Sequence, residues 1–99
     1  MSPPPCHRIP PGVEFQRWCG GEDWVLYHSG TGETLRVSEA ALAVLDLLSA
    51  AGTLPQDALA ETLNRQMDTP LSDVEIQAAL AEILRVLQRH ECVEQVACV

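Results

Sequence analysis

Lysine is absent from this chain, and its basic side chains are six arginines and three histidines. Aspartate and glutamate together number 14, which gives a formal net charge of −8 at pH 7. Proteins that bind nucleic acids gain much of their affinity by neutralising phosphates with Lys and Arg. The composition therefore argues against a nucleic-acid partner. The acidity favours either solubility alone or a preference for basic partners.

Long apolar runs are missing as well. None approaches the roughly 20 residues of a membrane-spanning helix, and the opening MSPPPCHRIPPGV lacks the long apolar segment of a secretory signal. The 99 residues suffice for one domain and not for two. We therefore expect a soluble, cytoplasmic protein with one domain and no membrane partner.

The sequence also lacks the common motifs of catalytic sites. It contains no G-x-x-x-x-G-K-[ST] phosphate loop, no G-x-S-x-G, no H-E-x-x-H and no C-x-x-C. Its three histidines lie far apart in the sequence, and we expect His28 to form a structural pair with Glu33 opposite it. Cys19 has only Arg17 nearby to activate its thiol. We expect a protein that is not an enzyme and that has no catalytic residue and no cofactor.

Four cysteines remain to be explained: Cys6, Cys19, Cys92 and Cys98. An even number is compatible with disulfides, but nothing else in the sequence suggests secretion. Cys92 and Cys98 are further apart than the closely spaced pairs of zinc sites. The sequence therefore predicts unpaired thiols and no metal site.

Five of the seven prolines fall within residues 1–12. Proline donates no backbone hydrogen bond, so this segment is poorly suited to a helix or to a central strand. We interpret residues 1–12 as a flexible, extended arm and residues 13–99 as the folded domain.

Three strands are expected next, at residues 13–18, 24–28 and 33–37. Two glycines between the second and third strands, Gly30 and Gly32, favour a tight turn. A loop with an even number of residues places Leu26 opposite Leu35 and Trp24 opposite Val37, on one face that we assign to the core. The other face carries Val25 and Tyr27 with Thr34 and Arg36.

Three helices are expected after the strands. Ser38 is a good N-cap for a helix from residue 39 to about 50. The segments Thr53–Gln56 and Ser72–Glu75 both fit a capping box, which predicts helices to about residues 66 and 90. In the third helix we expect a buried stripe of Ile76, Leu80, Ile83 and Leu87, with Leu84 on one flank and Ala79 and Val86 on the other. Residues 92–96 form either a short terminal strand or an extended tail.

The predicted order of elements is a three-stranded antiparallel sheet followed by three helices, an α+β arrangement like that of a winged helix-turn-helix domain. The stretch WVLYHSGTGETLRVSEAALAVLDLL, residues 24–48, resembles the PqqD family, and especially its branch of small peptide chaperones associated with HPr-kinase-related proteins. The resemblance covers residues 15 to about 96. The family's strand-to-helix junction often reads Leu-Asn, whereas this chain has Val37-Ser38, which keeps an apolar residue before an N-cap.

The resemblance implies that the chain binds a ribosomally made precursor peptide and presents it to a modifying enzyme. In this fold the leader segment of the precursor adds as a strand beside the third strand and packs against the third helix, which is β-augmentation. The opposite flank of the third helix, with Gln77, Leu84 and Gln88, is the alternative contact surface. The residues implied for peptide binding are Glu33, Thr34, Leu35, Arg36 and Val37 on the strand, and Glu75, Ala79, Glu82 and Val86 on the helix.

Two other functions are left open by the sequence. A winged-helix regulator that binds DNA would need a basic recognition helix, but residues 72–90 carry Asp73, Glu75 and Glu82 against Arg85 and Arg89. An adaptor subunit that docks on a kinase-like enzyme without holding a peptide would use a broader surface, such as the face with Val25 and Tyr27. Edge-to-edge pairing through the third strand would give a homodimer in which the groove is masked.

Overall fold

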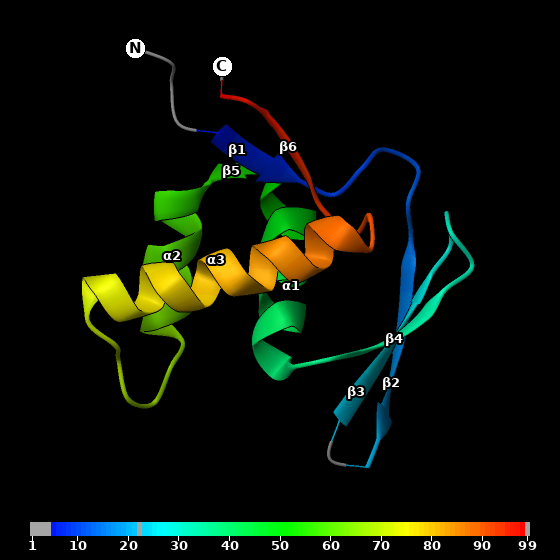
Figure 1. Ribbon diagram of the computed structural model, residues 1–99, viewed down its shortest axis with the longest axis horizontal. Helices are drawn as coiled ribbons and strands as arrows, with labels where there is room; N and C mark the ends of the chain where they lie inside the picture. Colours follow the sequence, from blue (N-terminus) through cyan, green and yellow to red (C-terminus); the bar gives the residue numbers. More distant parts are fainter. Residues whose placement is uncertain (1–4, 22, 99) are drawn as a thin grey trace.

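The hairpin and the helices that the sequence predicts are present in the computed structural model, which describes residues 5–21 and 23–98 (Figure 1). Within these residues the chain is α+β, with two antiparallel three-stranded sheets and three helices. The predicted fold class is confirmed, and a second sheet is added to it. The elements are β1 (Pro5–Arg8), β2 (Phe15–Gly20), β3 (Asp23–His28), β4 (Thr34–Val37), α1 (Glu39–Ala51), β5 (Thr53–Pro55), α2 (Gln56–Arg65), α3 (Asp73–Arg89) and β6 (Glu94–Ala97).

The first sheet has the order β2-β3-β4, and its register is the predicted one. Trp24 pairs with Val37 and Leu26 with Leu35. Leu26 is fully buried, and the other three side chains pack against the core. Alternation along each strand then places Val25 and Tyr27 on the outer face.

Two of the three predicted helix starts are confirmed. The Ser38 hydroxyl accepts the N–H of Ala41 at 3.1 Å and caps α1, and Ser72 and Glu75 form a complete capping box on α3. The capping box predicted at Thr53–Gln56 is wrong. Residues 53–55 pair with β1 as strand β5, so α2 begins at Gln56 with Pro55 as an N-cap that offers no side-chain hydrogen bond.

The core lies where α3 crosses α1 and α2 (Figure 1). The buried stripe of α3 consists of Ile76, Leu80, Leu84 and Leu87, while Ile83 is only half-buried. The periodicity predicts Ile83 in the stripe, whereas the structure has Leu84 there. Periodicity within one helix does not determine how that helix is rotated about its axis against its two neighbours. This rotation buries the Leu84 flank and leaves the Ala79 flank open.

The second sheet, with the order β5-β1-β6, corrects the prediction of a flexible arm over residues 1–12. Residues 5–8 form the central strand β1, which pairs with β5 on one side and with β6 on the other. Residues 1–4 of the predicted arm lie outside the described residues. The folded domain therefore does not begin at residue 13. β6 confirms the strand alternative for the C-terminal segment.

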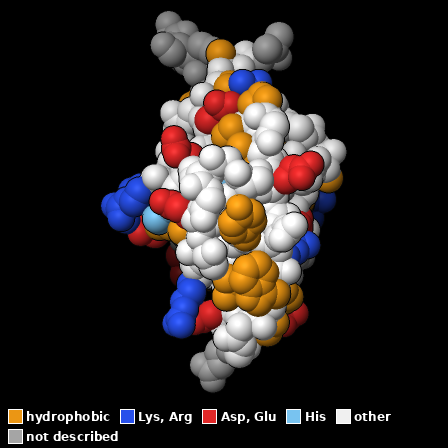
Figure 2. Space-filling view, turned by 90° about the vertical axis from the view of Figure 1, so that its right-hand side faces the viewer, with side chains coloured by type: hydrophobic (Ala, Val, Ile, Leu, Met, Phe, Trp, Pro, Cys, Tyr) orange, Lys and Arg blue, Asp and Glu red, His pale blue; other side chains and the backbone are white. Residues whose placement is uncertain are grey.

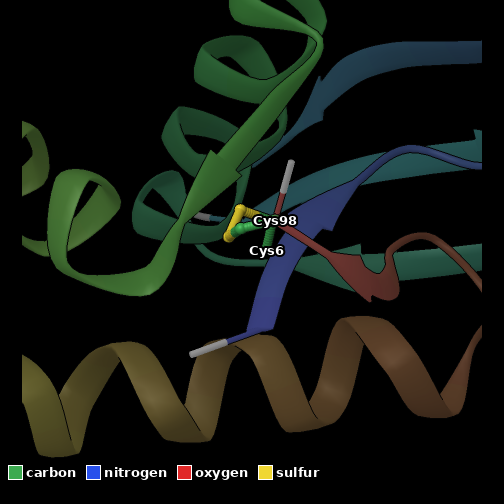
Figure 3. Close-up of a disulfide and its surroundings, with 2 residues drawn as sticks. All are labelled: Cys6 and Cys98. Atoms are coloured by element: carbon green, nitrogen blue, oxygen red, sulfur yellow. A yellow bond between two sulfur atoms is a disulfide. The ribbon is translucent and has the colours of Figure 1, made fainter. Parts of the chain in front are cut away.

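A disulfide joins this sheet's central strand to the end of the chain, where unpaired thiols were expected. Cys6 on β1 is bonded to Cys98, just after β6, with their Cα atoms 5.2 Å apart (Figure 3). The two cysteines are separated by 92 positions, so only the pairing of β1 with β6 brings them together. Cys19 and Cys92 are free. Burial, together with the charge of Glu33, raises the pKa of the Cys92 thiol to about 11, which leaves it protonated and unreactive near neutral pH.

His28 is a structural residue, but its side chain does not pair with that of Glu33. It is fully buried, and its Nδ1 accepts the N–H groups of Gly30 and Thr31 at 3.0 and 3.2 Å. Since Nδ1 accepts two hydrogen bonds, the proton lies on Nε2, which donates to the carbonyl of Glu91 at 2.9 Å. His28 thus ties the turn before β4 to the turn that follows α3.

The burial of His7, on β1, should make the free energy of unfolding depend on pH. Its ring is buried, neither ring nitrogen has a hydrogen-bond partner of ordinary geometry, and burial lowers its pKa from the usual 6.5, with Gln56 opposing the shift in part. Because the unfolded chain then binds a proton more readily than the folded one, the stability is fully present above pH 6.5 and is lost as the pH falls from there toward the lowered value.

We therefore expect the free energy of unfolding to fall between pH 7 and pH 5, and to fall less in His7→Leu. Urea unfolding of both proteins across this range measures the difference. Equal pH slopes in the two proteins would contradict the prediction.

No helix in the described part of the chain is both long and apolar enough to cross a membrane.

Candidate functional site

Strand β4 has one free edge. It is the last strand in the order β2-β3-β4, and it pairs only with β3 among the described residues. The strand continues through Ser38 directly into α1. An unpaired edge presents a row of backbone N–H and C=O groups that another extended chain can use.

The pattern of hydrogen bonds between β3 and β4 shows which backbone groups of β4 are not used within the sheet. The N–H of His28 donates to the carbonyl of Glu33 at 2.9 Å, so this opposed pair is a hydrogen-bonded one. Hydrogen-bonded and non-hydrogen-bonded pairs alternate along an antiparallel ladder. Leu35 and Val37 therefore bond to β3, whereas the N–H and C=O groups of Thr34 and Arg36 point away from it along the free edge.

The predicted strand residues thus divide into two kinds. Leu35 and Val37 turn their side chains toward the core, and Thr34 and Arg36 are exposed. Glu33 precedes the strand, and its carboxylate lies 3.3 Å from Nδ1 of His90, just beyond the end of α3. This contact links the start of β4 to the end of α3.

On α3 the predicted flank is exposed or half-buried along its length. Val86 is 39% exposed, and Ala79 is half-buried. Both glutamates of the flank already have partners, because Glu75 belongs to the capping box and Glu82 accepts hydrogen bonds from Arg85, one of them at 3.1 Å. The pKa of Glu82 is lowered by this hydrogen bond and by the positive charge of Arg85.

The opposite flank of α3 faces the rest of the protein. Leu84 is 3% exposed. The amide of Gln77 accepts a hydrogen bond from Gln56 at 3.2 Å and donates one to Asp57 at 3.1 Å, which fastens this flank to the start of α2. Gln88 is half-buried. The flank with Ala79 and Val86 is therefore the more accessible of the two.

A hollow of about 520 Å³ lies between α1, α3 and the segment that joins α2 to α3. One of its lining residues is Glu39, which lies two residues after the end of β4. Among the residues predicted to bind a peptide, Ala79 alone lines it. The other residues that line the hollow are not indicated by the sequence pattern. The helical spacing of Ala40 with Ala43, and of Ala79 with Ile83, indicates that each pair lies on one face of its helix. Nothing in the sequence indicates that these two faces lie against each other. The hollow is lined by Glu39, Ala40, Ala43, Leu63, Gln66, Met67, Asp68, Thr69, Leu71, Ile76, Ala79 and Ile83.

A second exposed surface is the outer face of the first sheet. Trp18 pairs with Val25 across β2 and β3, and Tyr27 lies two residues further along β3 on the same face. Trp18 is 47% exposed. Figure 2 shows hydrophobic side chains gathered on this side of the molecule, with charged side chains of both signs around them.

Nothing in the geometry of the described residues forms a metal centre. No three His, Cys, Asp or Glu side chains within this part of the chain come together closely enough to hold an ion.

The comparison with solved structures gives one informative likeness. The fold is similar to that of TbiB1 in complex with the TbiA(beta) leader peptide, with a TM-score of 0.66 over 92% of this chain and 99% of that one. The two sequences are 18% identical, so the likeness is one of fold. No protein-family model matches the chain, and no curated protein matches it significantly.

Proposed function

We propose that this chain is a peptide-recognition element. It binds the leader segment of a ribosomally made precursor peptide and presents it to a modifying enzyme, as part of the biosynthesis of a peptide natural product. The observation that carries the proposal is the free edge of β4, where the backbone groups of Thr34 and Arg36 are unpaired among the described residues. The start of β4 contacts the end of α3 through Glu33 and His90, and Glu39, just after β4, lines one hollow with Ala79 on the accessible flank of α3. The resemblance to the PqqD family and the shared fold with a protein in complex with a leader peptide both support it.

The proposed binding mode is strand addition. The leader pairs with the N–H and C=O groups of Thr34 and Arg36 and lies about 4.8 Å from β4. Side chains on one face of the added strand meet Ala79 and Val86 of α3. Backbone pairing supplies affinity that does not depend on the leader's sequence, and the contacts with α3 supply specificity.

The proposal includes a cytoplasmic protein that is not an enzyme and uses no cofactor. Its two partners are the leader and the modifying enzyme. A homodimer through β4 is an alternative use of the same edge, and it would compete with the leader for Thr34 and Arg36.

The charge distribution supports a peptide rather than DNA as the partner. Five of the six arginines each lie within 4 Å of a carboxylate: Arg8, Arg17, Arg36, Arg65 and Arg85. On α3, Arg85 is bound to Glu82, which leaves little positive charge to neutralise phosphates.

An adaptor that docks on a partner enzyme without holding a peptide is the second candidate. The apolar outer face of the first sheet, where Trp18 is 47% exposed and Val25 and Tyr27 are half-buried, favours it. Such an adaptor would bind its partner equally well when the edge of β4 is blocked.

A titration followed by backbone amide shifts tests the proposal. The probe is the leader segment of a short peptide that is encoded beside the gene for this protein. We expect the largest shifts at residues 33–37 and 79–86. Shifts confined to β2 and β3, or none until the neighbouring enzyme is added, would overturn the proposal in favour of the adaptor.

A further inference from the structure

The hollow between α1 and α3 has the dimensions of a side-chain pocket at the end of β4. Its wall is built from small residues where two helices face each other: Ala40 and Ala43 on α1 and Ala79 on α3. Leu71 and Ile83 line it as well. Burying an apolar side chain of the size of Leu or Phe there would strengthen binding about tenfold to 150-fold.

Two carboxylates stand at this hollow without a cation. Glu39 and Asp68 both line it and are exposed, and neither forms an ion pair with a described residue. Among the described residues, no arginine or histidine lines the hollow. Since five arginines are already paired elsewhere, the chain itself offers little positive charge to balance this site.

The path of an added strand leads toward these groups. A peptide that pairs with Thr34 and Arg36 reaches the start of α1 where β4 ends, because only Ser38 separates β4 from α1. Side chains two residues apart on the peptide point to the same side. One of them can therefore enter the hollow while a neighbour reaches its rim. The aliphatic stem of a Lys or Arg can lie over Ala40 or Met67 while the charged group meets Glu39 or Asp68.

We infer that this hollow selects leader peptides that carry a large apolar residue with a lysine or arginine about two residues away. The inference rests on the proposed function, since the strand on β4 delivers both side chains. It names the chemistry of the ligand: a basic, apolar extended segment. The inference also assigns recognition of the basic side chain to Glu39 and Asp68 instead of Glu75 and Glu82, which have partners within the protein.

Selection from a display library of random peptides tests the inference without a known precursor. Peptides of about 12 residues are long enough to exceed a typical strand on both sides. We expect peptides enriched on the wild-type protein to carry the apolar and basic pair, and to lose affinity as the salt concentration rises. The double variant Glu39→Gln with Asp68→Asn should bind the selected peptides about threefold to tenfold more weakly, as expected for exposed ion pairs. Glu14→Gln, an exposed carboxylate away from the hollow, is the matched control and should not change binding.

A second pair of variants tests the pocket itself. Ala79→Leu fills the hollow and should lower the affinity for the selected peptides at least about tenfold, the equivalent of burying one side chain less well. Ala81→Leu adds the same bulk at an exposed position of α3 outside the hollow and should not change it. Enriched peptides that shift the amides of β4 but show no basic preference would overturn the inference and leave the proposed function standing. Enriched peptides that bind away from β4 would overturn both.

Discussion

Replacing Arg36 with proline is expected to weaken leader binding by a factor of about 30 or more while the fold is retained. The N–H of Arg36 points along the free edge of β4, so proline at this position removes a donor that the sheet itself does not use. The bound peptide would lose one hydrogen bond, and its carbonyl would be left without a partner against the proline ring. A lost bond together with an unsatisfied buried acceptor costs about 2–4 kcal/mol, which corresponds to a change in Kd of about 30-fold to 1,000-fold.

The matched control is Arg36→Ala, which keeps the backbone N–H and removes only the side chain. The Arg36 side chain is 84% exposed, and its guanidinium lies 3.8 Å from the carboxylate of Asp23, so its loss should change stability and binding little. Leu35→Pro serves as a second comparison and should destabilise the sheet, because the N–H of Leu35 bonds to β3. Isothermal titration with the leader, together with circular dichroism of each variant, separates binding from folding. If a folded Arg36→Pro protein binds the leader as tightly as the wild type does, the peptide does not use this edge.

The Cys6–Cys98 disulfide is expected to contribute about 2–5 kcal/mol to the free energy of unfolding. The bond closes a loop of 92 positions, nearly the whole chain. In the chain-entropy account, so long a loop restricts the unfolded state by an amount near the top of the usual range, about 4.6 kcal/mol. Small domains have a total stability of only about 5–15 kcal/mol, so the disulfide is a large part of it.

Urea unfolding with and without a reductant measures this contribution. The wild type should lose stability in reductant, whereas Cys98→Ser should show the low value under both conditions. Cys19→Ser is the control, because Cys19 is an exposed free thiol and its loss should leave the effect of the reductant unchanged. A wild-type protein that is insensitive to reductant would contradict the prediction. In a cytoplasm that keeps thiols reduced, strands β1 and β6 would still be held by backbone pairing and by the ion pair between Arg8 and Glu94, at 2.9 Å.

Local sequence signals determined the elements that surround the candidate site. The register of β3 and β4 follows from alternation and an even turn, so Trp24 opposite Val37 and Leu26 opposite Leu35 could be predicted correctly. The helix caps at Ser38 and Ser72 could also be predicted, because each cap depends only on residues within one helical turn. The resemblance to the PqqD family likewise implies that the third strand has a free edge, but not which of its backbone groups are unpaired.

Only the tertiary structure decided which surfaces remain open. The sheet of β5, β1 and β6 joins segments from both ends of the chain, and no local pattern links Cys6 to Cys98. The rotation of α3 buries Leu84 and leaves Ala79 accessible, because the helix must fit two neighbours at once. The hollow, with Glu39 and Asp68 at its wall, exists only where α1, α3 and the segment before α3 meet. Each of these features depends on contacts between residues far apart in the sequence, which periodicity within a single element does not encode.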